Sequence, residues 1–435
     1  MTEKNFFTSL PYLIIISLAT FFIWFFKLDY IGLPIYIGII FVLSIFVKNS
    51  IYIIPFLLNL LFMISQTEWD INSIPLSLYI AVPALIVGFI IHIIKYRVNI
   101  FKGKFFLGVL LLVIAMLASN FINNQTYDTN FFFIIGASLL YLLIYGFFAN
   151  TITGDNLIYL IRIFVILGVM IAFQVLAFYL QEPDVIHALE TKSIDLGWGL
   201  SNFVATYLIM FIATITYFVK KYKLHIFWIV LLLFEVTMLL FTLSRAGIIA
   251  FIITAIFLIL FMFIKYDHKL ALLLNLIIGL IMLGIVVYFT RDYFLTIWER
   301  VKLFGLDDNG RIPIWEEAIA TFKDNLIFGA GLFARSAGPN ELRMFHNTIL
   351  HILACFGIIG GLALLVQFIS ILRIFFYQFN QMKAILLIAI MGANIHGMVD
   401  NTYIMPQYMI IMFVMIAVVE NANKIDKIRL ELRLG

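Results

Sequence analysis

The chain has 435 residues, of which 64% are hydrophobic and only 12% are charged, and its mean hydropathy is +1.10. Water-soluble domains are usually about half apolar and about a quarter charged, so this composition excludes a water-soluble fold. The net charge of +4 gives no reason to expect nucleic acid as a partner, and the single cysteine, Cys355, excludes an internal disulfide framework and a cysteine metal site.

Apolar runs separated by short polar breaks recur along the chain, and each run is long enough to cross a hydrocarbon core of about 30 Å as a helix. Helices are required, because lipid offers no hydrogen-bond partner for free backbone groups. We therefore predict an all-α polytopic membrane protein that forms one integral membrane domain over residues 1–435. It should have about fourteen transmembrane helices, near 10–26, 31–47, 51–65, 74–94, 104–122, 131–149, 157–180, 199–219, 224–243, 247–264, 270–289, 347–372, 384–400 and 403–420.

Basic residues gather in alternate breaks between these runs, which places those breaks and both termini in the cytoplasm. The basic positions are Lys95, Arg97, Lys102, Lys104, Lys220, Lys221, Lys223, Lys265, Lys269 and, in the tail, Lys424, Lys427, Arg429 and Arg433. The opposite breaks are acidic or neutral. The longest break, residues 290–346, then lies on the extracytoplasmic side.

This outer segment contains a helical pattern over residues 310–322. Pro313 suits a first helical position, and Glu316 and Glu317 suit the positive N-terminal end of a helix. The apolar residues share one face, namely Ile314, Trp315, Ala318, Ile319 and Phe322. We predict a short amphipathic helix that packs across the mouth of the bundle.

The outer segment is also rich in arginine, with five arginines against two lysines. A guanidinium group can hold phosphate oxygens in a bidentate fork, so this preference indicates an anionic phosphate ligand. Ion pairing with the acidic residues of the same segment is the alternative. The arginines are Arg291, Arg300, Arg311, Arg335 and Arg343.

Two charged residues lie within or next to the apolar runs. Arg245 follows Ser244 at an outer boundary with almost no loop, and Glu235 lies near the middle of a run. Ionisable groups at membrane depth usually face a cavity and mark a substrate path. The alternative for Arg245 is a side chain that extends to the membrane–water interface. The alternative for Glu235 is a buried pair with another group.

Histidines stand near the outer ends of two late runs. His346 ends the outer segment and is followed by Asn347, and an imidazole there can accept a proton near neutral pH. His396 and Asp400 are four residues apart, which on a helix places them on one face as a hydrogen-bonded pair. A purely structural role is the alternative for each.

In sequence order, these motifs resemble the O-antigen ligase and polymerase superfamily of bacterial surface polysaccharide assembly. The resemblance covers about residues 195 to 405, and the first six runs match only in general character. It depends on the motifs at Leu243–Gly247, Gly310–Trp315, Leu326–Gly331, His346–Leu350 and Phe356–Gly360.

The resemblance implies a metal-independent, inverting glycosyltransferase of the GT-C type without a cofactor. By the same resemblance, Arg245 and Arg311 would hold the pyrophosphate of a lipid-linked donor, and His346 would accept the proton of, or orient, the attacking hydroxyl. The first outer loop, Lys27–Tyr30, lacks the paired acidic motif of metal-using relatives. We expect substrate-binding roles for the remaining polar residues singled out above, namely Arg291, Arg335, Arg343, Asn347, His396, Asp400 and Glu235.

Within this superfamily the acceptor is a second lipid-linked repeat unit, lipid A core, or a protein side chain. The compact outer segment and the Val399-Asp400-Asn401 sequence favour a polymerase, which would take undecaprenyl-pyrophosphate-linked oligosaccharide as both donor and acceptor in the bacterial cytoplasmic membrane. A co-polymerase that sets chain length is a further partner consistent with this resemblance. An O-antigen ligase is the alternative within the superfamily, and a lipid or glycan flippase or transporter is the alternative outside it.

Overall fold

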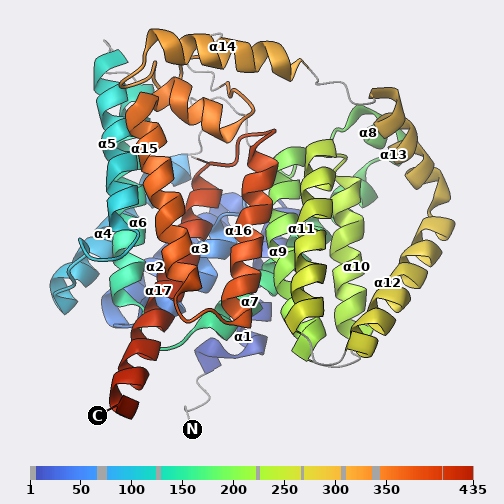
Figure 1. The fold of residues 1–435 in the computed structure, drawn as a ribbon, viewed down its shortest axis with the longest axis horizontal. Helices are drawn as coiled ribbons and strands as arrows, with labels where there is room; N and C mark the ends of the chain where they lie inside the picture. Colours follow the sequence, from blue (N-terminus) through green and yellow to red (C-terminus); the bar gives the residue numbers. More distant parts are fainter. Residues whose placement is uncertain are drawn as a thin grey trace.

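The computed structural model describes residues 6–65, 76–123, 129–221, 226–265, 269–304, 310–335, 343–403 and 405–434. All regular elements within these ranges are helical, which confirms the predicted all-α class (Figure 1). The short 3-10 helices are η1 (Phe6–Thr8) and η2 (Ser50–Tyr52). The α-helices are α1 (Leu10–Phe25), α2 (Asp29–Phe46), α3 (Ile54–Leu60), α4 (Leu76–Tyr96), α5 (Phe106–Asn123), α6 (Thr129–Thr151), α7 (Leu157–Gln181), α8 (Val185–Thr191), α9 (Ser201–Lys221), α10 (Ile226–Phe241), α11 (Arg245–Lys265), α12 (Lys269–Phe289), α13 (Arg291–Phe304), α14 (Arg311–Asp324), α15 (Thr348–Phe376), α16 (Gln381–Gly397) and α17 (Pro406–Leu434).

Nine helices within the described ranges are long and apolar enough to cross a membrane, and the chain is a multi-pass membrane protein. These are α2, α5, α6, α7, α9, α11, α12, α15 and α17. The other predicted spans fall on helices that are shorter or less apolar in their described parts: α1, α3, α4, α10 and α16. The expected number of about fourteen therefore stays a prediction.

The predicted span over residues 51–65 is wrong as a continuous helix. It folds as η2, the seven-residue helix α3 and a non-helical stretch, and every residue of α3 is buried. This segment still crosses from one end of the bundle to the other. At its start, Thr151 Oγ1 donates to Ser50 Oγ at 2.6 Å, and at its finish, Ser65 N donates to Asp29 Oδ2 at 3.4 Å. Non-helical backbone is tolerated at this depth because protein surrounds it, and Gln174 Nε2 donates to Phe62 O at 3.0 Å.

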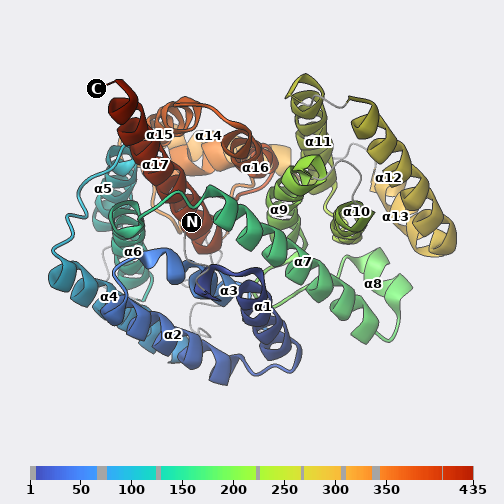
Figure 2. The same ribbon diagram turned by 90° about the horizontal axis from the view of Figure 1, so that it is seen from below.

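The centre and the edge of the bundle differ strongly in burial. In α9 and α17, 83% and 89% of the most apolar window is buried, whereas in α12 the buried share is 11%. Helix α9 packs against α7, α10, α11 and α16, while α12 lies at the periphery beside α10 (Figure 2). The core is therefore built on α9 and α17, and α12 presents most of its surface outward.

Both termini lie at one end of the bundle, and α8, α13 and α14 lie at the other (Figure 1). The second end also holds the first residues of α9, α11 and α15 and the last residues of α16. Below, these are called the terminal end and the α14 end. The predicted sidedness makes the α14 end the extracytoplasmic one.

The outer segment of residues 290–346 contains two helices, not the single one predicted. The expected helix over 310–322 is present as α14, which begins at Arg311, so Pro313 lies in its first turn. The second helix, α13, follows α12 almost directly and packs against α8. It was missed because only residues 290–292 separate its apolar residues from the apolar run of α12. The outer segment is thus largely helical where it is described.

Helix α15 contains a kink at Gly357, whose φ is +62°. Opposite the kink lies the turn after α14, where Ala330 N donates to Ala354 O at 2.8 Å and Gly331 N donates to Cys355 O at 3.0 Å. In the other direction, Ile358 N donates to Leu326 O at 2.8 Å. At the kink, backbone N–H and C=O groups of α15 lose their partners within the helix, and the turn after α14 supplies hydrogen bonds to them. These groups are therefore paired inside the bundle. This contact fixes α14 over the start of α15.

Candidate active site

His346 lies between α14 and α15, and hydrogen bonds hold its backbone carbonyl and the side chain of the next residue. Trp315 Nε1 of α14 donates to His346 O at 3.1 Å. The next residue, Asn347, caps α15 by accepting from Leu350 N at 3.0 Å and also donates to Met398 O at 2.8 Å. His346 itself has a φ of +46°, a left-handed conformation that histidine adopts more readily than most residues. The imidazole is therefore presented from a fixed backbone.

The His346 imidazole is hydrogen-bonded to a carboxylate from another element. Its Nδ1 lies 3.1 Å from Asp400 Oδ1, and the side chains are 39% and 6% exposed, respectively. A carboxylate can only accept, so Nδ1 carries the hydrogen and Nε2 is the nitrogen that can take a proton. This is the arrangement in which a buried aspartate orients a general-base histidine.

Asp400 lies in the loop between α16 and α17. Burial raises the pKa of its carboxyl, but the hydrogen bond from His346, the nearby His396 and the backbone N–H of Asn401 at 2.8 Å outweigh burial and leave the pKa below its ordinary value. Hydrogen bonds to the charged form favour that form. Asp400 is therefore an ionised partner for His346.

Asn202, in the first turn of α9, extends this pair into a network. Its Nδ2 donates to Asp400 Oδ2, and its Oδ1 accepts from Ser244 Oγ at 2.8 Å and from Lys192 Nζ at 3.0 Å. Sequence reasoning missed Asn202 and Lys192 as site residues, since asparagine and lysine near a predicted helix end are common caps and solvated charges. The tertiary contacts alone identify them.

The predicted hydrogen-bonded pair of His396 and Asp400 is wrong. Helix α16 ends at Gly397, so Asp400 is not on a helical face with His396. His396 is fully buried, with Nδ1 2.7 Å from Thr206 Oγ1 and Nε2 3.4 Å from Ser244 Oγ. The two residues belong to one network through Ser244 and Asn202 instead.

Arg245 and Arg311 add positive charge to the edge of this network. Arg245 is the first residue of α11, directly after Ser244, and Arg311 is the first residue of α14. Both side chains are half-buried, and the charge of Arg311 lies close enough to act on His396. The structure thus brings the three predicted catalytic residues to the same end of the bundle, and Asp400 and Asn202 link His346 to Ser244, the residue before Arg245.

Residues 227–365 match the family described as O-antigen ligase. This stretch is similar to that family's domain and is called the O-antigen ligase domain below. The family implies an enzyme that transfers lipid-linked glycan, and it does not distinguish a ligase from a polymerase. A search of curated proteins found no match.

The O-antigen ligase domain holds only part of the network. Arg245, Arg311 and His346 lie inside the matched residues, whereas Asn202 and Asp400 lie outside them. The carboxylate that orients His346 therefore comes from the chain after the domain, and the asparagine that holds the carboxylate comes from the chain before it.

The other predicted arginines differ in their placement. Arg335 pairs with Glu317 of α14 at 2.9 Å and donates to Met344 O at 3.0 Å, so it ties the segment before His346 to α14. Arg343 is exposed. Arg291 pairs with its neighbour Asp292 at 3.6 Å at the start of α13, and both side chains are more than 70% exposed. The contacts of the described residues do not join Arg291 to the network.

Glu235 lies away from the network, in the interior of α10. It is fully buried, and within the described part of the chain neither carboxyl oxygen has a hydrogen-bond partner. A Cβ atom at Gly168 of α7 would approach Glu235 Oε1 to 2.6 Å, so the carboxyl packs against that glycine. The structure does not bring Glu235 to His346.

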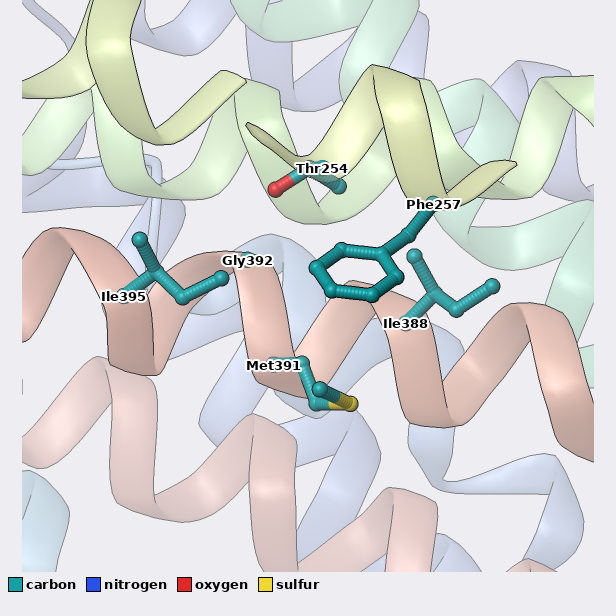
Figure 3. Close-up of a pocket in the computed structure, with 6 residues that line it drawn as sticks. All are labelled: Thr254, Phe257, Ile388, Met391, Gly392 and Ile395. Atoms are coloured by element: carbon teal, nitrogen blue, oxygen red, sulfur yellow. The ribbon is translucent and has the colours of Figure 1, made fainter. Parts of the chain in front are cut away.

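A small apolar cavity of about 30 Å³ lies between α11 and α16 (Figure 3). Its volume matches about one or two water molecules, which is too small for a sugar or a lipid headgroup. It lies between α11, which begins directly after Ser244, and α16, which carries His396, and none of its lining residues is charged. These are Thr254, Phe257, Ile388, Met391, Gly392 and Ile395.

Proposed function

We propose that this protein is a polysaccharide polymerase that joins undecaprenyl-pyrophosphate-linked repeat units on the outer face of the bacterial cytoplasmic membrane. The observation that carries the proposal is the His346–Asp400 pair, with Nδ1 and Oδ1 3.1 Å apart, at the α14 end, where α11 begins with Arg245 and α14 begins with Arg311. A base and two cations at the end of membrane helices suit a substrate whose activated group is held by a lipid.

The proposed reaction needs a base for the acceptor. His346 Nε2 takes the proton of the acceptor hydroxyl as its oxygen attacks the anomeric carbon of the donor, and Asp400 stabilises the imidazolium that forms. The new glycosidic bond forms as the bond from that carbon to the pyrophosphate oxygen breaks. Attack opposite the leaving group inverts the configuration at that carbon.

The departing group is a lipid pyrophosphate, and negative charge develops on it during transfer. Arg245 and Arg311 are placed to bind it, since guanidinium groups make strong bidentate contacts with phosphate oxygens. Their positions at the first residues of α11 and α14 leave their charges at the helix ends, not within the apolar interior. The proposed step uses only side chains of this chain and requires no metal ion.

A polymerase is preferred to a ligase because the outer segment is short, and its described parts consist of α13, α14 and the connections next to them. An O-antigen ligase that transfers glycan to lipid A core is the second candidate, favoured by the description of the matched family. In either case the donor is the same and only the acceptor differs. A co-polymerase that sets chain length is a proposed partner of the polymerase.

The decisive experiment deletes the gene and separates the surface glycan on a ladder gel. Loss of a polymerase leaves a single repeat unit attached to its final acceptor. Loss of a ligase instead leaves polymer on the lipid carrier, and loss of a flippase leaves repeat units on the cytoplasmic side. Either of the last two patterns contradicts the polymerase proposal.

Alanine substitutions then test the site. Arg245→Ala, Arg311→Ala and His346→Ala should each reproduce the deletion pattern while the protein remains in the membrane at its normal amount. If all three variants make chains of near-normal length, the proposed mechanism is wrong even if the deletion pattern is that of a polymerase.

A further inference from the structure

Asn202 joins the two halves of the candidate site. On one side its Nδ2 donates to Oδ2 of Asp400, the carboxylate whose Oδ1 is bound to His346. On the other side its Oδ1 accepts from Ser244 Oγ at 2.8 Å, directly before Arg245. One amide therefore links the proton-accepting pair with the start of the arginine-bearing helix.

The chemistry of its neighbours fixes the orientation of this amide. The Lys192 ammonium, 3.0 Å from Asn202 Oδ1, can only donate, and the Asp400 carboxylate can only accept. The reverse orientation would set amide N–H groups against the ammonium and the amide oxygen against the carboxylate. In this orientation Asn202 offers a donor to Asp400 and an acceptor to Ser244 and Lys192 together.

Ser244 has a single hydroxyl hydrogen, and that hydrogen is given to Asn202. Its oxygen also accepts from Gly247 N at 3.1 Å, so it caps α11. The bond to Asn202 therefore holds the first turn of α11, and with it the backbone of Arg245, against α9.

We propose that Asn202 is a positioning residue that aims Asp400 Oδ1 at His346 and fixes the Arg245-bearing turn relative to that pair. The inference rests on the proposed function, because it assigns Asn202 a part in the same transfer. Asn202 does not touch the reacting atoms, and it acts through Asp400 and Ser244.

Asn202→Asp is the sharpest test, because it keeps the size of the side chain and replaces the donor with a carboxylate. Two carboxylates in contact either both stay charged, which adds negative charge beside His346, or share a proton, which takes charge from Asp400. In both cases the acidic limb of the pH–rate profile should move away from its wild-type position by roughly one unit. The rate at neutral pH should fall. The measurement is chain extension by the purified full-length protein in liposomes at a series of pH values.

The matched control is Asn156→Asp, the same change directly before α7 at the terminal end, where Asn156 bonds backbone carbonyls of Thr153 and Gly154. This variant should keep the wild-type pH profile. An Asn202→Asp protein that also keeps the wild-type profile, with only a smaller folded amount, would overturn the inference and leave Asn202 as a structural residue.

A second variant covers the case in which Asn202→Asp does not fold. The exchange Asn202→Asp with Asp400→Asn restores one donor and one acceptor between the two positions and leaves the net charge unchanged. It moves the carboxylate one residue away from His346, so the folded exchange variant should have its acidic limb at lower pH than the wild type and a lower rate. A wild-type rate and profile in this variant would also overturn the inference.

Failure of the inference and failure of the proposed function give different results. If His346→Ala still extends chains, the proposed function is wrong. If His346→Ala is inactive while both Asn202 variants behave as the wild type, the function stands and only the role of Asn202 is lost.

Discussion

The two ends of the bundle both contain buried polar clusters, but the clusters are built differently. At the terminal end, Glu420 accepts from Lys104 N at 2.9 Å and from the Tyr145 hydroxyl at 2.8 Å, while the buried Lys383 donates to the backbone carbonyls of Tyr377 and Gln378. Most of these bonds join a side chain to the backbone of another element. They fasten loops to α17 and α16.

At the α14 end, side chains bond mainly to other side chains, and the network ends at an imidazole that is 39% exposed. A cluster that only attaches loops to helices does not require an exposed, titratable side chain. The comparison teaches that burial and hydrogen bonding alone do not mark a functional site. What marks it is a satisfied buried network that orients one accessible proton acceptor.

Breaking the α14-end network at its carboxylate should have the largest effect. Asp400→Asn removes the charge that stabilises the His346 imidazolium and permits the wrong tautomer, so chain extension should fall by roughly 10²–10⁴-fold. The measurement is the initial rate per folded protein in liposomes. A loss confined to the folded amount would show that Asp400 only supports the fold.

Removing one cation should have the next largest effect. Arg311→Ala deletes a guanidinium that we propose binds the leaving pyrophosphate, and the rate of chain extension should fall by roughly 10²–10³-fold. Arg311→Lys keeps the charge without the bidentate fork and should recover part of that loss. Equal rates for alanine, lysine and wild type would exclude Arg311 from the site.

Breaking the terminal-end cluster should change stability and not chemistry. Glu420→Gln sets an amide N–H group against either the Tyr145 hydroxyl or Lys104 N, which should cost about 1–3 kcal/mol of unfolding free energy. Thermal unfolding in detergent measures that loss. The rate per folded molecule should stay at the wild-type value, and a selective loss of rate would erase the contrast between the two ends.

The smallest effect is expected at Arg291. Its exposed pair with Asp292 is worth little, so Arg291→Ala should change the rate of chain extension by less than about twofold. A comparison with Arg311→Ala at equal amounts of folded protein tests whether the two outer arginines differ as their positions indicate. A large loss at Arg291 would extend the substrate site to α13.

The sequence allowed the membrane class and most helices to be predicted, and it singled out Arg245, Arg311 and His346, whose catalytic roles stay predictions. Apolar length is enough for lipid-crossing helices, and a charge at the end of such a helix stands out against it. The break at residues 51–65 was not predictable, because an apolar run looks the same whether it forms one helix or a short helix followed by a non-helical stretch buried in protein.

The partners of the predicted residues were harder to obtain. The spacing of His396 and Asp400 predicts a pair only if the helix continues, but α16 ends at Gly397, where a Cβ atom would approach Thr348 Oγ1 to 2.8 Å. Asp400 then turns to His346, 54 residues earlier in the chain. Asn202 carries no local signal, because its role arises from contacts with the residue after α8, the residue before α11 and the loop after α16.

The most direct test replaces His346 by asparagine, a residue that accepts the left-handed backbone at this position but cannot take up a proton. Purified full-length protein in liposomes is given lipid-linked repeat units, and the initial rate of chain extension is measured at matched amounts of folded wild-type and His346→Asn protein. The account predicts a rate lower by roughly 10²–10⁴-fold with unchanged thermal unfolding. A His346→Asn protein that extends chains at the wild-type rate would contradict it.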